Sequence, residues 1–101
     1  MVPNNVVETA AALPAAWSSS SFCRVGTAWV KVLRMDSGPV PEEVHGADEV
    51  LLVLDGRLEL LVEDTEVVVE GGEMVRVPAG ARHAVRPGSR GTLVIVEESG
   101  A

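Results

Sequence analysis

The sequence predicts an all-β domain, organised as a sandwich or a barrel. Short β-branched and apolar segments recur after residue 22, turn residues separate them, and no segment keeps a helical 3.6-residue period. With 101 residues and 47% hydrophobic side chains, the chain is long enough to pack one core. We therefore expect one barrel domain over residues 22–101, preceded by a short N-terminal arm over residues 1–21.

The arm differs from the rest in composition. The alanine-rich segment ETAAALPAAW (8–17) predicts a helical turn or two, limited by Pro14. The serine run 18–21 predicts a loop. A loosely ordered terminus is the alternative. Four apolar side chains are expected to hold the arm against the barrel: Val6, Val7, Leu13 and Trp17.

The first half of the barrel begins with a predicted strand, TAWVKVLRM (27–35), followed by the strand-breaking segment SGPVPEE (37–43). EVLLVL (49–54) is a continuous apolar run, typical of a strand that is buried on both faces. Asp55-Gly56 follows and predicts a hairpin turn. In RLELLVE (57–63) the alternation places Leu58, Leu60 and Val62 on one face.

The second half continues the pattern of short strands and turns. A turn is expected at Asp64-Thr65, and the strands EVVVE (66–70) and EMVRVP (73–78) are separated by Gly71-Gly72. ARHAVRP (81–87) and GTLVIVEE (91–98), with Pro87-Gly88 between them, complete seven or eight strands.

Charge and composition limit the partners. The net charge is −7 and Lys/Arg residues do not cluster, so nucleic acid and anionic membrane surfaces are not expected partners. No apolar run reaches the roughly 18 residues of a membrane span, and the N-terminus does not resemble a secretory signal. The single cysteine, Cys23, cannot form an intramolecular disulfide, so a cytoplasmic location is expected.

Four residues form the candidate site. Glu43 and His45 lie two positions apart and share a face if the segment is extended, and Glu49 follows at the start of the next strand. His83 follows the turn PAGA (78–81). A barrel interior can gather all four, and two imidazoles with a carboxylate suit Fe(II) or zinc. Ordinary surface or core histidines are the alternative interpretation.

At these positions the chain resembles the cupins. EVHGADEVLLVLDG (43–56) is similar to their first motif, and GEMVRVPAGARHAVRP (72–87) to their second, within a match over residues 28–97. The resemblance implies a double-stranded β-helix (a jelly-roll barrel), usually dimeric, with a divalent metal on the barrel axis. It implies His45, Glu49 and His83 as ligands. Glu43 stands where the family usually has its first histidine, and Pro87 replaces the final asparagine of the second motif.

Two alignments of the first motif are open. A gapped reading keeps His45 and Glu49 at the family spacing and makes Glu43 a candidate fourth ligand. An ungapped reading places Glu42 and Val44 at the two histidine positions and moves His45 out of register. We prefer the gapped reading. A second carboxylate adds a hard oxygen ligand to the site, which favours Fe, Mn or Zn over the soft ion Cu(I), and Ni is a further candidate.

The expected function is a small metal-binding cupin that binds or transforms a small polar metabolite at a divalent metal ion (Fe, Mn, Ni or Zn). If the protein is an enzyme, dioxygenase, isomerase and lyase chemistry all occur on this scaffold, and the fold does not choose among them. The alternative is a metal-free ligand-binding or protein-interaction module. The second apolar face of residues 49–54 (Val50, Leu52 and Leu54) needs a cover, which the arm or a second subunit can supply, and we expect a homodimer.

Overall fold

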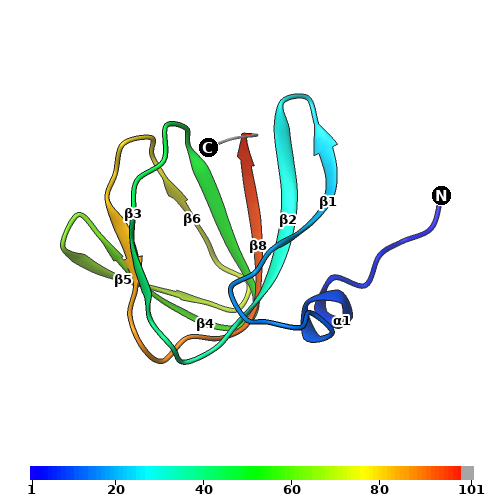
Figure 1. Ribbon diagram of the computed structural model, residues 1–101, viewed down its shortest axis with the longest axis horizontal. Helices are drawn as coiled ribbons and strands as arrows, with labels where there is room; N and C mark the ends of the chain where they lie inside the picture. The colour runs from blue at the N-terminus through cyan, green and yellow to red at the C-terminus, as the bar shows by residue number, and fades with distance from the viewer. Residues whose placement is uncertain (99–101) are drawn as a thin grey trace.

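Antiparallel pairing organises residues 1–98, the part of the chain that the computed structural model describes (Figure 1). The described residues form one helix and eight strands, which confirms the all-β class. The order in the sheet is β1-β2-β8-β4-β7-β3, and β5 and β6 each pair with β4. The elements are α1 (Val6–Ala11), β1 (Ser20–Val25), β2 (Ala28–Met35), β3 (Val40–Glu43), β4 (Glu49–Val62), β5 (Thr65–Glu70), β6 (Met74–Val77), β7 (His83–Val85) and β8 (Arg90–Glu98).

The predicted hairpin at Asp55-Gly56 is wrong. β4 continues through these residues as one 14-residue strand. Its first part pairs with β6, its last part pairs with β5 and β7, and β8 runs beside residues 49–57. β4 is therefore the central strand of the curled sheet, and its long-range pairing overrides the local turn preference of Asp-Gly.

Two glycines explain how β4 bends at this point without turning back. Gly56 has φ +83°, and a Cβ built on it would lie 2.1 Å from the carbonyl oxygen of Arg90 on β8. Gly91 has φ +99°, and its Cβ would lie 2.2 Å from the carbonyl oxygen of Asp55. The register of β4 against β8 shifts between Val53 and Asp55. The two backbones thus approach more closely than side chains permit, as is common where a strand bends at a bulge.

Three smaller features also differ from expectation. The segment 37–43, predicted to break strands, contains β3, which pairs with β7. The turn predicted at Asp64-Thr65 lies one residue earlier, at Glu63 and Asp64, whose φ angles are +47° and +67°. Positive φ at both central residues is the conformation of the turns that join twisted hairpin strands. β1 begins at Ser20, inside the serine run predicted as a loop, because it pairs with β2.

The core lies inside the curl of the sheet. Leu58 and Leu60 are 0% and 1% exposed, and Val62 packs against the core, so the predicted facing of this segment is confirmed. Leu51 and Val53 of the first half of β4 are also buried. The opposite face of the same strand is only partly covered: Leu54 is 38% exposed.

The arm forms a short helix beside β2 and β8 (Figure 1). Asn5 caps it by accepting a hydrogen bond from the N–H of Glu8, and the helix ends at Ala11, ahead of Pro14. The helical turns predicted here are confirmed. Ala10, 1% exposed, makes the buried contact, whereas Val7, expected to face the barrel, is 41% exposed. Within residues 1–98 no helix is both long and apolar enough to cross a membrane.

Candidate metal centre and ligand pocket

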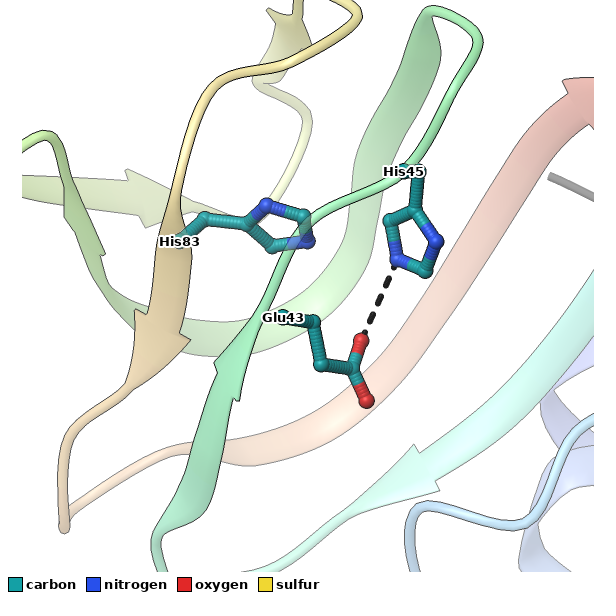
Figure 2. Close-up of side chains that lie close together, drawn as sticks. All are labelled: Glu43, His45 and His83. Carbon is teal, nitrogen blue, oxygen red and sulfur yellow. Dashed lines mark hydrogen bonds and ion pairs between the residues drawn. The ribbon is translucent and has the colours of Figure 1, made fainter.

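Glu43 and His45 reach the barrel interior from the end of β3 (Figure 2). Glu43 is paired in register with His83 of β7, and a carboxylate oxygen of Glu43 lies 3.2 Å from His45 Nε2. Val44, between them, is 58% exposed and points away, as alternation in an extended segment requires. Glu42 is exposed and lies 3.7 Å from Arg82. The geometry therefore agrees with the gapped alignment, which pairs Glu43 with His45.

His83 is buried and held in one orientation. It is 7% exposed, and its Nδ1 lies 3.1 Å from the carbonyl oxygen of Ala81. A carbonyl oxygen can only accept, so in the neutral imidazole Nδ1 carries the proton and the lone pair lies on Nε2. This arrangement, in which one ring nitrogen donates to the backbone and the lone pair of the other is available to a metal ion, is typical of metal-binding histidines.

Three of the four predicted site residues come together. The ligand atoms of Glu43, His45 and His83 all lie within 4.8 Å of one another, and the two imidazole centroids are 5.1 Å apart. Two atoms bound to one ion at about 2.1 Å are at most about 4.2 Å apart, so small side-chain movements would complete a site. Two imidazoles and a carboxylate are a suitable donor set for Fe, Mn, Ni or Zn.

Glu49, the fourth predicted residue, lies beside this triad and not within it. Its carboxylate oxygen is 3.6 Å from His83 Nε2, and the residue is 6% exposed. Burial, followed by the hydrogen bond with Glu97 and the charges of Glu97 and Glu43, raises the pKa of Glu49 to about 8. At neutral pH the metal-free protein thus holds Glu49 mainly as the neutral acid.

Glu97 is a site residue that the sequence did not indicate. It lies opposite Glu49 in the β4–β8 register and accepts a hydrogen bond of 2.7 Å from Lys31 Nζ. Burial alone would raise the pKa of Glu97, but the hydrogen bonds from Glu49 and Lys31 outweigh it and hold that pKa below its usual value. Of the two carboxyl groups, Glu49 is therefore the one that keeps its proton and Glu97 the one that carries the negative charge. No motif pointed to Glu97, because its role depends on pairing between strands 48 residues apart.

The two loops that carry the histidines are joined to each other. The N–H of Gly80 donates to the carbonyl oxygen of His45 at 2.9 Å, and the N–H of Ala79 donates to Asp48 at 2.9 Å. Arg76 forms an ion pair with Asp48 and has a side chain that is 61% exposed. Arg76 is therefore an exposed charge and does not line the cavity described below.

A cavity of about 180 Å³ extends from the triad into the barrel. Its polar lining consists of Ser19, Glu43, His45, Glu49, His83 and Glu97. The remaining lining is apolar and comes from β2, β3, β4, β7 and β8, together with Trp17 of the arm. Trp17 was predicted only as a packing residue, so its place in the pocket wall is an additional finding.

The fold and the motif positions define a cupin-type barrel, and comparison with known proteins identifies the family. The model of the cupin domain family matches residues 32–97, so this chain belongs to the cupin family. The predicted double-stranded β-helix is thereby confirmed. The search of curated proteins found no match.

Solved structures agree with this fold. A cupin-2 domain protein from Shewanella frigidimarina has a TM-score of 0.85 at 22% identity, covering 94% of this chain and 93% of its own. A protein from Neisseria meningitidis has a TM-score of 0.82 at 23% identity, covering 97% of this chain and 100% of its own. Hydroquinone 1,2-dioxygenase from a Sphingomonas species, solved with 4-hydroxybenzoate bound, has a TM-score of 0.83 at 18% identity, covering 96% of this chain and 74% of its own. At these identities the likeness establishes the fold.

Proposed function

We propose that this cupin binds a divalent metal ion through Glu43, His45 and His83, with Glu49 as a fourth ligand, and receives a small molecule with a polar group at that site. The observation that carries the proposal is the convergence of the three ligand groups within 4.8 Å at one end of the cavity. The orientation of His83, with Nε2 free, supports it. An ion there would also offset the cost of burying the carboxylates.

A bound ion would supply Lewis-acid polarisation of a ligand oxygen and, if it is Fe or Mn, redox chemistry. The residues of the chain orient the ligand set: the Ala81 carbonyl fixes the His83 ring, and the Gly80–His45 hydrogen bond joins the two histidine loops. In the metal-free state Glu49 keeps its proton at neutral pH. This proton must leave before Glu49 can act as a carboxylate ligand, so metal uptake should release protons.

Metal content tests the proposal. Tag-free protein should carry, or take up, about one equivalent of Fe, Mn, Ni or Zn per chain by elemental analysis. His83→Ala and His45→Ala should abolish stoichiometric binding, and Glu43→Gln should weaken it about tenfold or more. Glu42→Gln is the matched control, because Glu42 is the adjacent exposed glutamate and lies outside the triad. Stoichiometric metal that survives both histidine substitutions would rule out this ligand set.

The alternative function is a metal-free binding module. The Glu49–Glu97 pair favours it, because protonation satisfies Glu49 without an ion. In that case no metal binds under any loading condition, while a small molecule still binds in the cavity. A homodimer and a cytoplasmic location remain part of the proposal. Support for the dimer comes from the partly exposed outer face of β4 and β6, and support for the location from the single free cysteine, Cys23.

A further inference from the structure

The body of the cavity is apolar and has the size of one ring. Leu33, Leu51, Leu58 and Leu93 are among the residues that line it, and each is 5% exposed or less. Its volume is about 180 Å³. An apolar cavity of about 150 Å³ holds a benzene molecule. Pockets for drug-sized ligands are larger, at roughly 300 Å³ or more, so the ligand here is a small molecule with a largely apolar body.

The polar groups lie at one end of the cavity. Along β8 the residues that face it are Leu93, Ile95 and Glu97, so the wall changes from apolar to acidic toward the end of the strand. Glu97 and Glu49 face each other there. A ligand that matches this change from an apolar to a polar wall has an apolar body and one polar group.

Charge limits what that polar group can be. Three carboxyl groups, Glu43, Glu49 and Glu97, line the polar end, and Lys31, the basic residue beside them, is already paired with Glu97. In the metal-free protein a ligand carboxylate or phosphate would meet the negative charges of Glu43 and Glu97 in a partly buried site, where repulsion is strong. A neutral hydroxyl group can instead donate a hydrogen bond to a carboxylate or place its oxygen near the two histidines.

Trp17 forms part of the cavity wall on the side of the arm. Its backbone N–H donates to the carbonyl oxygen of Arg34 at 2.9 Å, and its indole Nε1 donates to Asp36 at 2.9 Å. It adopts φ +63°, a conformation that is unfavourable for a bulky residue and persists where surrounding contacts enforce it, often at ligand sites. With its backbone and its indole nitrogen both held by hydrogen bonds, Trp17 presents a fixed aromatic side chain to the cavity.

We propose that the cavity binds a neutral phenol, one aromatic ring whose hydroxyl group lies at the Glu43–His45–His83 end, and that Trp17 is the specificity-determining wall against the ring. This rests on the proposed function for the polar end of the site. The volume of the apolar cavity limits the ligand to one ring, the acidic end favours a neutral polar group, and the fixed indole favours an aromatic ring.

The chain allows a direct fluorescence test, because Trp17 and Trp29 are its only tryptophans and it has no tyrosine. Trp29 is not among the residues that line the cavity, so Trp29→Phe leaves Trp17 as the single reporter. Titration of this variant with phenol should change the Trp17 emission in a saturable way. In metal-free protein, benzoate, which has the same ring with a negative charge, and glucose, which is polar throughout, should need concentrations at least about tenfold higher.

Substitution of Trp17 tests the wall. Calorimetric titration of Trp17→Leu should show weaker phenol binding and a shift of about tenfold in favour of the two-ring 2-naphthol over phenol, because the cavity becomes longer. Trp17→Phe keeps an aromatic wall and should retain the preference for phenol, which covers the case in which Trp17→Leu does not fold. A preference unchanged in every Trp17 variant that folds would overturn the role of Trp17. Equal affinity for phenol, benzoate and glucose would overturn the ligand class.

Each titration is done on metal-free protein and on protein loaded with Zn(II), with metal content measured separately. Phenol binding to protein that takes up no metal supports the inference and rejects the metal site. Stoichiometric metal without saturable phenol binding in either state rejects the inference and leaves the metal site standing.

Discussion

Glu49 and Glu97 lie directly opposite each other on β4 and β8, with the buried carboxyl group of Glu49 beside His83 and the partly buried carboxylate of Glu97 paired with Lys31. The two acids are stabilised in different forms. Glu49 is stabilised as the neutral acid, and Glu97 is stabilised as a carboxylate by the ammonium group of Lys31. Three acidic side chains line one end of the cavity. Because one of them is neutral and another is paired with a lysine, the barrel can fold without a counter-ion at each.

This pair predicts a pH dependence for the metal-free protein. The pKa of Glu49 is about 8 in the folded chain and near 4.5 when unfolded, so between these values the folded state keeps a proton that the unfolded state has released. The contribution of Glu49 to the free energy of unfolding should therefore fall as pH rises from about 4.5 to 8. Urea unfolding at several pH values measures it. Glu49→Gln should flatten the decline of the free energy of unfolding with pH, and Glu42→Gln should leave this decline unchanged. An identical slope in the wild type and both variants would contradict the raised pKa of Glu49.

The close approach of β4 and β8 predicts that Gly56 cannot be replaced. Gly56→Ala would place a methyl group 2.1 Å from the Arg90 carbonyl at a φ that only glycine adopts easily, so we expect a loss of about 3 kcal/mol or more in the free energy of unfolding. Gly46→Ala is the control, since a Cβ there meets nothing within 4 Å. Chemical denaturation measures both. A Gly56→Ala protein as stable as Gly46→Ala would show that the bend is absent.

The loop contacts of Asp48 predict an effect at a distance from the ligands. Asp48→Ala removes the acceptor for the Ala79 N–H and the partner of Arg76, so the His83 loop loses an attachment to the His45 loop. We expect metal affinity to fall by up to about tenfold with stoichiometry unchanged. Asp48→Asn keeps an oxygen that can accept from the Ala79 N–H, and its metal affinity should lie between those of the wild type and Asp48→Ala. Competition titration against a chromogenic chelator provides the measurement, and an affinity equal to wild type in Asp48→Ala would refute the coupling.

The outer face of β4 and β6 predicts the oligomeric state. Leu54 is 38% exposed and Met74, paired in register with Leu52, is 61% exposed. If this face joins two copies of the chain, the wild type should have the mass of a dimer by light scattering and Met74→Glu should be a monomer. Val25→Glu on β1, at a residue 68% exposed, is the control and should remain dimeric. A monomeric wild type at high concentration would end this prediction.

Local pattern was sufficient for much of the fold. Alternation placed Leu58 and Leu60 inside, and glycine and proline marked most strand ends correctly. Alternation also directed Glu43 and His45 to the same side, whereas His83 joins them through the pairing of β3 with β7. The assignment of these residues and Glu49 as metal ligands stays a prediction, as does the division into an arm over residues 1–21 and a barrel over residues 22–101.

Other features depend on segments far apart in the chain. Asp55-Gly56 has the local chemistry of a hairpin turn, yet pairing with β8 makes it a bend in one long strand. Glu97 reaches Glu49 only through the β4–β8 register, and Trp17 reaches the cavity only because Arg34 and Asp36 hold the arm there. A residue's neighbours along the chain set its conformational preference and facing. Its partners across the sheet set burial, charge and strain, and those were decided by the tertiary structure alone.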